Sequence, residues 1–406
     1  MVKIAILGYG TIGSGVGQVL RENAALVEKR AGTPIEAKYI LDLRDFLGDP
    51  EESKVVHDID VILDDPEVRI VVECMGGLHP AYEYVRRCLE HRKSVVTSNK
   101  ELVAAYGGEL LDFAHRNELN YQFEASVGGG IPVIRAINSA LTAENLEAVT
   151  GILNGTTNYI LTRMKNEGLS YEEVLKDAQA LGYAERDPSA DVLGHDAGRK
   201  LSILSSLAFD VTVKYEDIRC EGITKVSQED IRYATELGMA IKLLAKSRRV
   251  GQEVFARVGP SMVGPDHLLY NVTDVFNGIL IRGNMVGDIL LVGKGAGSLP
   301  TASAVVADVI DEAKHLHRSV WGDWKDERVH LADFEDLSCR FFVRLAGDLT
   351  QARREEAEEV FKAERFVTIP GLEEFGFVTA PIRGRDLHAL IDSRKDVLSR
   401  YRIDEA

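Results

Sequence analysis

The glycine-rich turn GYGTIG at residues 8–13 constrains this chain more than any other feature. It follows VKIAILG, a continuous apolar run typical of a strand that is buried on both faces of a parallel sheet. A helical stretch comes next, and in this context the G-x-G-x-x-G spacing predicts a dinucleotide-binding turn rather than a merely tight strand–helix connection. We expect Gly8 to permit the turn, Gly10 to let the backbone approach a pyrophosphate, and Gly13 to let helix and strand pack closely.

The first third of the chain alternates strand-like and helical segments, and this predicts an α/β fold with an N-terminal Rossmann sheet, which is parallel and doubly wound. Helices are expected at 16–29, 80–91 and 107–117. The further strand-like runs are IEAKYIL (35–41), IDVIL (59–63), VRIVVECM (68–75), KSVVTS (93–98) and LNYQFEA (119–125).

From about residue 131 the pattern changes to long amphipathic helices with isolated strands, which predicts a central α+β domain. A helix opened by Pro300 and capped by Thr301 is expected over 300–316, followed by a linker at 317–330. The tail has a βαββα pattern with a last strand at YRID. The predicted division is 1–134 plus 300–320 for the Rossmann domain, 135–299 for a catalytic and dimerisation domain, and 335–406 for a small α+β module.

Composition excludes several classes of partner. A net charge of −16 without a long Lys/Arg run argues against nucleic acid and against acidic membranes. The four scattered cysteines are typical of a reducing compartment, and no apolar run is long enough to span a bilayer. The N-terminal run leads straight into the glycine turn and does not resemble a signal peptide. We therefore expect a cytoplasmic protein that acts on a small-molecule substrate.

The choice of dinucleotide depends on the end of the second strand, LDLRD. The N–H groups of Thr11 and Ile12 at the helix start are expected to face the phosphates of either cofactor. Asp42 is placed to accept a hydrogen bond from a ribose 2′-hydroxyl, which favours NAD, although it lies 29 residues past Gly13 rather than about twenty. Arg44 is placed to pair with the 2′-phosphate of NADP. We expect NADP to be preferred and NAD to be accepted.

The segment GYAERDPSADVLGHDAGRK, which ends at Lys200, puts an acid and an amine on the apolar side of a predicted helix. At about 100° per residue, Asp196 and Lys200 project with the aliphatic side chains. A buried ammonium group readily loses its proton and can supply or accept the proton that accompanies hydride transfer. Glu185 and Asp191 add carboxyl groups nearby. The alternative is an ion pair on a solvated helix surface.

Three other segments are candidates for the site. Lys100 in TSNK follows a predicted parallel strand, and ligands of doubly wound sheets bind at such ends. FEASVGGGIP combines Glu124 with glycines whose carbonyls suit a hard monovalent cation, although an interdomain turn fits equally well. LNGTTNYIL at 153–161 is a polar turn that either caps a helix or lines the substrate cleft. The ten histidines show no metal-ligand spacing, so no zinc is expected.

Six ordered motifs over about 1–320 closely resemble homoserine dehydrogenase: GYGTIG, SNKELV, EASVGGGIPVI, LNGTTNYIL, GYAERDPSADVLGHDAGRK and KGAGSLPTASAVVADV. The resemblance implies reversible NAD(P)-dependent interconversion of L-homoserine and L-aspartate 4-semialdehyde, in the route to threonine and methionine. It also implies a homodimer or homotetramer, assembled through the central domain.

The same resemblance assigns roles to individual residues. Lys200 matches the proton donor and acceptor of the family, and Lys100 matches the lysine near cofactor and substrate. The implied substrate-binding acids are Glu185, Asp191 and Asp196; the implied ligands of a sodium ion are Glu124 and the carbonyls of Val127, Gly129 and Ile131; and the implied further glycines of the cofactor or substrate site are Gly182 and Gly297.

The tail only loosely resembles the ligand-binding ACT domain that ends many relatives, so 335–406 is interpreted as a degenerate ACT-like module. Two other functions fit the residues alone. One is an NAD(P)-dependent reductase of another amino-acid-derived aldehyde, and the other is a non-catalytic NAD(P)-binding sensor. A sensor needs no proton-transfer lysine, and the Asp196/Lys200 pair therefore argues against it.

Overall fold

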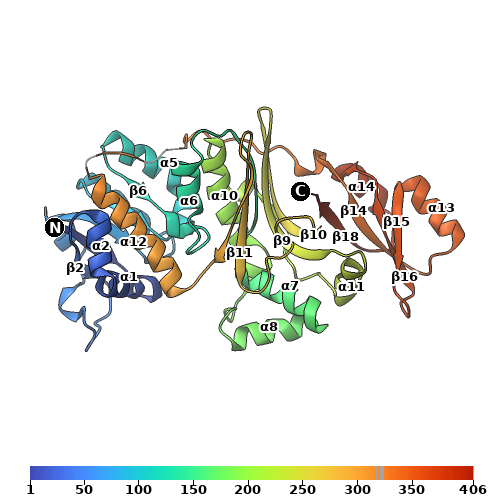
Figure 1. Ribbon diagram of the computed structural model, residues 1–406, viewed down its shortest axis with the longest axis horizontal. Helices are drawn as coiled ribbons and strands as arrows, with labels where there is room; N and C mark the ends of the chain where they lie inside the picture. Colours follow the sequence, from blue (N-terminus) through green and yellow to red (C-terminus); the bar gives the residue numbers. More distant parts are fainter. Residues whose placement is uncertain (317, 321–323, 406) are drawn as a thin grey trace.

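A computed structural model describes residues 1–316, 318–320 and 324–405 of the chain. Its three parts lie in a row, as Figure 1 shows: the N-terminal part in blue at one end, the central part in green and yellow, and the C-terminal part in red at the other end. In the described part of the chain, no helix has both the length and the apolar character needed to cross a bilayer.

The N-terminal part is a six-stranded parallel sheet with the order β3-β2-β1-β4-β5-β6. This is the strand order of dinucleotide-binding folds, so the predicted Rossmann sheet is confirmed. Its strands are β1 (Val2–Leu7), β2 (Ile35–Leu41), β3 (Val55–Val56), β4 (Val68–Glu73), β5 (Ser94–Thr97) and β6 (Tyr121–Gln122). Its helices are η1 (Glu52–Lys54), α1 (Thr11–Glu22), α2 (Ala24–Ala31), α3 (Asp60–Leu63), α4 (Ala81–Glu90) and α5 (Lys100–Arg116).

Three local predictions in this part were wrong. The run IDVIL forms α3 instead of a strand, because Ile59, Ile62 and Leu63 are buried at the i, i+3, i+4 spacing of a helix face. The helix expected over 16–29 is divided at Asn23 into α1 and α2. The helix expected over 107–117 begins earlier, at Lys100, because the side chain of Asn99 caps it by accepting a hydrogen bond from the N–H of Leu102.

One large mixed sheet unites the central and C-terminal parts. Its path is β12-β11-β7-β9-β10-β18-β14-β16-β15, and β8 also pairs with β10. The strands are β7 (Leu146–Ile152), β8 (Arg219–Cys220), β9 (Ala240–Val250), β10 (Glu253–Val263), β11 (Phe276–Gly283), β12 (Gly287–Lys294), β14 (Phe341–Ala346), β15 (Ala363–Thr368), β16 (Glu374–Thr379) and β18 (Val397–Asp404), with a separate pair β13 (Ser338–Cys339) and β17 (Ile382–Arg383).

The remaining helices bury their apolar side chains in three cores. They are η2 (Glu124–Ser126), α6 (Val133–Arg135), η3 (Ala136–Ala140), α7 (Gly155–Glu167), α8 (Tyr171–Ala180), α9 (Ser189–Val192), α10 (His195–Phe209), η4 (Tyr215–Asp217), α11 (Gln228–Glu236), α12 (Ser298–Lys314), η5 (Phe334–Asp336), α13 (Gln351–Val360) and α14 (Gly384–Ile391). Of these, α12 packs with the Rossmann sheet, α13 and α14 pack with the C-terminal strands, and most of the others pack in the large central core.

The C-terminal part has the element order βαββαβ: β14, α13, β15, β16, α14 and β18. The predicted last strand at YRID is therefore confirmed as the end of β18. A core of its own lies around Phe341, Phe375 and Phe377. This part does not stand apart from the rest, because β18 pairs in parallel with β10 from Ser261↔Arg402 to Val263↔Asp404. The C-terminal strands thus continue the central sheet.

The chain returns to the N-terminal part through α12, which packs against α1 (Figure 1). This helix begins at Ser298, so Thr301 lies inside it and does not cap it, contrary to expectation. The predicted linker at 317–330 falls partly outside the described residues. Trp324 within it is buried, and an added Cβ at Gly107 of α5 would lie 2.4 Å from its ring. At Trp324 the chain is therefore packed against α5 and is not free.

Glu312 on α12 leads to the first prediction. The residue is buried, and within the described part of the chain neither carboxylate oxygen has a hydrogen bond of ordinary geometry. Burial outweighs the effect of Ser94 and Asn120, which lie close enough to lower the pKa of Glu312. Burial raises the pKa of Glu312 to about 7, whereas an unfolded glutamate titrates near 4.3. The folded state therefore binds the proton more tightly, and stability falls as pH rises from about 4 to above 7.

We expect Glu312→Gln to raise the free energy of unfolding at pH 8, by up to about 3 kcal/mol, and to change it far less at pH 5. Urea denaturation at both pH values measures this, with Glu358→Gln on the exposed face of α13 as the matched control. An equal effect of Glu312→Gln at the two pH values would contradict the prediction.

Candidate active site

The glycine turn has the geometry of a phosphate-binding turn. Gly8 has φ +86°, a left-handed conformation that favours glycine, and an added Cβ at Gly13 would lie 2.0 Å from the Gly8 carbonyl oxygen. Gly10 faces open space, with nothing within 4 Å of an added Cβ. α1 begins directly after it without a side-chain cap, so its first N–H groups and its positive dipole end are free for an anion.

A cavity of about 460 Å³ adjoins this turn and is lined by Gly8, Gly10, Asp42, Arg44 and the loop 74–76, among others. Arg44 donates from Nε to Asp42 Oδ1 at 2.9 Å and from Nη2 to Oδ2 at 3.0 Å. This bidentate ion pair lowers the pKa of Asp42 to about 2. Asp42 and Arg44, the two residues expected to decide between NAD and NADP, thus contact each other. The Arg44 side chain remains 62% exposed.

A cluster of charged and polar side chains lies where the start of α5, the start of α7 and the first turns of α10 meet. Lys100 is the first residue of α5, after β5; Asn154 follows β7 and caps α7 by accepting from the N–H of Thr157; and Asp196 and Lys200 lie on α10. Because Asp196 and Lys200 are four residues apart on one helix, their side chains project together. Lys100 and Asn154 follow the ends of strands, and the ligands of α/β folds bind at the carboxyl ends of strands.

The Asp196 carboxylate is the centre of this cluster. Lys200 Nζ lies 2.7 Å from Asp196 Oδ2, and Lys100 Nζ lies 2.7 Å from Oδ1. Lys200 also donates to the carbonyl of Leu153 at 2.8 Å. Asp196 and Lys200 are 4% and 8% exposed, so this pair is buried and is not a surface ion pair.

The electrostatics follow from burial and from the two amines. Burial raises the pKa of Asp196, but Lys200 and Lys100 outweigh it and hold the net pKa below its usual value. Burial lowers the pKa of Lys100, and the Asp196 carboxylate more than offsets this, so the net pKa is raised. Burial and the charge of Asp196 raise the pKa of Asp191. Asp196 is therefore the member that stays ionised.

A cavity of about 550 Å³ opens onto the cluster. Its lining brings together most of the predicted residues around Lys200: Lys100, Gly182, Glu185, Asp191, Asp196 and Gly297. Glu185 is exposed, in the loop after α8. Gly297 precedes α12, where Ser298 donates to the carbonyl of Thr11 at 2.7 Å. This contact places the cavity next to the start of α1, and hence next to the glycine turn.

The helical stretch differs from expectation in two respects. α10 begins at His195, after Gly194 with φ +85°, so Asp191 lies on the separate short helix α9. The serines on the side of the helix opposite Lys200 are also buried, and Ser206 donates to the carbonyl of Ser202 at 2.8 Å. α10 is thus enclosed on both sides.

Two residues of this cavity, Asn154 and Lys294, had no role of their own among the predictions. Asn154 lies in LNGTTNYIL, for which a helix cap and a lining of the cleft were the alternatives, and it does both. Asn154 Nδ2 donates to Asp191 Oδ1 at 2.7 Å and to Asp196 Oδ2 at 2.9 Å. It therefore fixes both carboxylates, while its own oxygen caps α7. The signal for it was an Asn at a helix start, which is common enough to pass as a plain cap. Lys294 is the exposed last residue of β12 and the first residue of the motif KGAGSLPTASAVVADV, which marked the segment without giving this lysine a role.

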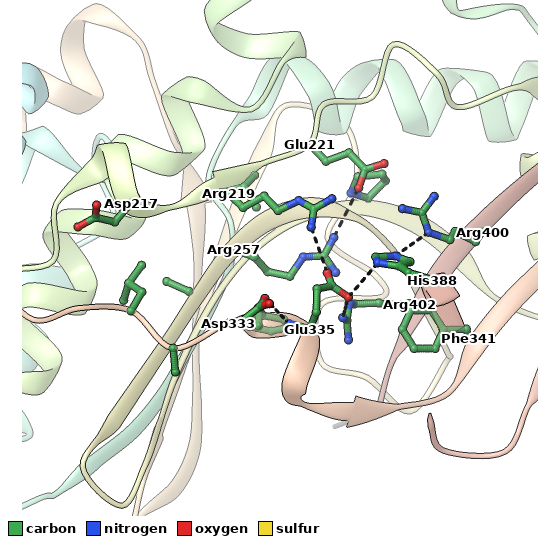
Figure 2. Close-up of a pocket in the computed structure, with 16 residues that line it drawn as sticks. Asp217, Arg219, Glu221, Arg257, Asp333, Glu335, Phe341, His388, Arg400 and Arg402 are labelled. Atoms are coloured by element: carbon green, nitrogen blue, oxygen red, sulfur yellow. Dashed lines mark hydrogen bonds and ion pairs between the residues drawn. The ribbon is translucent and has the colours of Figure 1, made fainter. Parts of the chain in front are cut away.

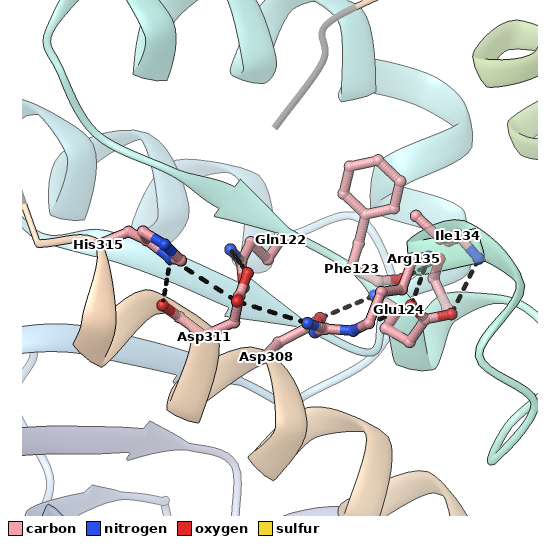
Figure 3. Close-up of polar contacts among 9 residues, drawn as sticks. Gln122, Phe123, Glu124, Ile134, Arg135, Asp308, Asp311 and His315 are labelled. Carbon is pink, nitrogen blue, oxygen red and sulfur yellow. Dashed lines mark hydrogen bonds and ion pairs between the residues drawn. The ribbon is translucent and has the colours of Figure 1, made fainter. Parts of the chain in front are cut away.

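The predicted cation ligand Glu124 has another task. Its Oε1 accepts from the N–H of Ile134 at 2.9 Å, and its Oε2 accepts from the N–H of Arg135 at 2.7 Å (Figure 3). Asp308 on α12 accepts from the Glu124 N–H and from Arg135 Nη2. Burial raises the pKa of Glu124 to about 7. This network joins the end of the Rossmann sheet to α12 and α6.

Of the three carbonyl groups predicted to bind a cation, those of Val127, Gly129 and Ile131, two have no hydrogen-bond donor among the described residues and one does. The Ile131 carbonyl accepts from the N–H of Val133 at 2.8 Å. Those of Val127 and Gly129, both buried, accept no hydrogen bond from residues that the structure describes. Buried carbonyl oxygens without donors are suited to a cation.

Comparisons with known proteins agree on one family. The model for the homoserine dehydrogenase catalytic region matches residues 132–310, and that for "Homoserine dehydrogenase, NAD binding domain" matches 8–124. The homoserine dehydrogenase of Bacillus subtilis is 39% identical, with 99% of this chain and 98% of that protein covered.

Solved structures agree with this result. A homoserine dehydrogenase from Thiobacillus denitrificans superposes with a TM-score of 0.91 at 35% identity, covering 100% of this chain and 98% of that one. A hyperthermophilic archaeal homoserine dehydrogenase mutant in complex with NADPH gives a TM-score of 0.66 at 28% identity, covering 77% and 97%.

Substitutions of two glycines in the turn should affect different properties: Gly10→Ala should affect cofactor binding, and Gly13→Ala should affect stability. Gly10→Ala meets no atom of the protein but intrudes where a dinucleotide would lie, so we expect wild-type thermal stability and NADPH binding weakened at least tenfold. Gly13→Ala meets the Gly8 carbonyl, so we expect a lower melting temperature. Fluorescence titration and thermal melting measure the two effects. Unchanged NADPH affinity in Gly10→Ala would contradict the assignment of the turn.

Proposed function

This chain belongs to the homoserine dehydrogenase family, and on that premise we propose that it interconverts L-homoserine and L-aspartate 4-semialdehyde with Lys200 as the proton donor and acceptor. The observation that carries the proposal is the buried Lys200 held by Asp196 in a cavity next to the glycine turn. The nicotinamide dinucleotide, held by the turn at Gly8–Gly13 when bound, supplies or accepts the hydride.

The hydrogen bonds of Lys200 explain how it acts. An ammonium group has three N–H donors, and two of them are directed to Asp196 and to the Leu153 carbonyl. The third has no acceptor among the residues that the structure describes, and it can be donated to the substrate oxygen. When the aldehyde is reduced, Lys200 donates its proton to the forming hydroxyl group, and in the reverse direction it accepts that proton. Because two amines keep Asp196 ionised, Asp196 orients Lys200 and does not take the proton itself.

The acids around the cavity suit the rest of the substrate. We assign Glu185 and Asp191 to the α-amino group, because carboxylates are the natural partners of an ammonium ion. Asn154 acts as a positioning residue that holds Asp191 and Asp196 in place. Lys100 lies between the Rossmann sheet and the cavity and serves both cofactor and substrate.

The proposal includes several finer points. NADP is preferred over NAD, because Arg44 neutralises Asp42 and remains exposed. A sodium ion is held by Glu124 and the carbonyls of Val127, Gly129 and Ile131, and the Glu124 carboxylate also orders the loop through the N–H groups of Ile134 and Arg135. Residues 1–134 with 300–320 bind the cofactor, 135–299 form the catalytic and dimerisation domain, and 335–406 form an ACT-like module. The enzyme is a cytoplasmic homodimer or homotetramer.

Replacing the proposed proton donor tests the mechanism. Lys200→Arg keeps the positive charge but binds its proton too tightly to exchange it. We expect turnover with homoserine to fall at least a hundredfold while NADPH affinity stays within about twofold. The exposed Lys176→Arg on α8 is the matched control. Near-normal turnover of Lys200→Arg, measured at 340 nm, would refute the role.

Replacing Arg44 tests the cofactor preference. Arg44→Ala removes the partner of a 2′-phosphate and frees Asp42 for a 2′-hydroxyl. We expect the KM for NADP to rise about tenfold and the KM for NAD to stay or fall. Asp42→Ala should raise the KM for NAD instead. If Arg44→Ala leaves the KM for NADP unchanged, Arg44 does not belong to the site.

A further inference from the structure

A separate cavity lies between the central sheet and the C-terminal part, away from the catalytic cluster. Its volume is about 150 Å³, and a cavity of that volume accommodates a molecule of about six non-hydrogen atoms. We call it the arginine cavity after four of its lining residues: Arg219 of β8, Arg257 of β10, and Arg400 and Arg402 of β18 (Figure 2). None of its lining residues also lines the catalytic cavity.

Positive charge is in excess in the arginine cavity. Four acids also line it, but Asp217 is bound by Arg328, which does not line the cavity. Arg385 lies 3.6 Å from Asp333 but contacts Asp336 more closely, so Asp333 is counted with the acids of the cavity. This leaves four guanidinium groups against the three carboxylates of Glu221, Asp333 and Glu335, an excess of one positive charge. His388 adds none at neutral pH, because burial and Arg400 lower its pKa.

Arg402 has acceptors for its guanidinium within the protein. It donates to Glu335 at 2.5 Å and to Cys339 Sγ at 3.0 Å. Glu335 is shared further, since Arg219 Nη1 lies 3.7 Å from it and His388 Nδ1 lies 3.9 Å from it. One carboxylate therefore serves three cationic or potentially cationic groups and cannot neutralise them all.

Arg257 lacks such an acceptor. Its side chain is 12% exposed, and its nearest carboxylate oxygen, on Glu221, is 3.9 Å away, beyond hydrogen-bond distance. Its guanidinium also lies over the ring of Phe334, whose centroid is 5.6 Å from Arg257 Cζ and which accepts no full hydrogen bond. Burial and the nearby Arg402 lower the pKa of Arg257 to about 10. A guanidinium group this enclosed and this poorly paired is destabilising unless something else supplies acceptors.

The backbone makes room for this arginine. Gly259 lies two residues further along β10, on the same face, and an added Cβ there would lie 2.2 Å from Arg257 Nη2. The guanidinium therefore lies over a glycine and faces the cavity. The site is formed by elements from two parts of the fold, so that a ligand in it contacts both.

We propose that the arginine cavity binds a small oxyanion, carrying a phosphate or a carboxylate group, with Arg257 as its principal ligand. Such groups offer planar or tetrahedral oxygen pairs that match the guanidinium fork, and their negative charge offsets the excess of positive charge. The bound anion joins β8 and β10 of the central part to β18 of the C-terminal part.

Calorimetric titration of the full chain in Tris chloride at constant ionic strength tests the proposal, with sodium phosphate in one arm and sodium acetate in the other. We expect saturable binding in at least one arm, which identifies the oxyanion. Arg257→Met should weaken it at least tenfold, as the loss of charged hydrogen bonds predicts. The matched control Arg365→Met, on the exposed strand β15, should bind like the wild type.

Thermal melting separates a ligand-binding arginine from a structural one. Without anion, Arg257→Met should melt at or above the wild-type temperature, because a poorly paired buried charge has been removed. With the anion, only the wild type should gain stability. The proposal is overturned if neither anion saturates the wild type below about 10 mM, if both proteins respond equally, or if Arg257→Met melts far below the wild type without anion. The wild-type titration decides even if the variant does not fold.

Discussion

The buried carboxylate of Asp196 determines the arrangement of the catalytic site. It lies between two amines, Lys100 from the end of the Rossmann sheet and Lys200 from α10 of the central part. Charge attraction at such short distances in a buried site is strong, and it compensates for the burial of Asp196 and Lys200. Because the two amines come from different parts of the fold, this interaction also fixes the glycine turn relative to the substrate cavity. The Glu124–Arg135–Asp308 network fixes the same junction from the other side.

Much of this could be predicted from the sequence, because the signals are local. The strand–turn–helix context identified the glycine turn, and four-residue spacing paired Asp196 with Lys200. Signals that depend on tertiary contacts were missed. IDVIL is too short for its period to distinguish strand from helix. Gly194 ends α9 through a left-handed backbone that a helical projection cannot show. The role of Asn154 depends on carboxylates 37 and 42 residues away, and Trp324 is buried only because α5 has glycines beneath it.

The catalytic cavity and the arginine cavity are built on different principles. In the catalytic cluster, every donor of Lys200 but one has an acceptor, and Asp196 has a cation at each oxygen. In the arginine cavity, guanidinium groups outnumber the carboxylates available to them. A balanced cluster holds a proton donor in position, whereas an unbalanced one requires an anion from outside. The continuous sheet through β10 and β18 connects the strands that carry the arginine cavity.

The most direct test of the catalytic account is a crystal structure of the ternary complex with NADP and L-homoserine. It should show Lys200 Nζ within about 3.2 Å of the substrate hydroxyl oxygen, with its contacts to Asp196 and the Leu153 carbonyl retained. If that hydroxyl group instead contacts solvent or another side chain while Lys200 remains out of reach, the central claim is wrong.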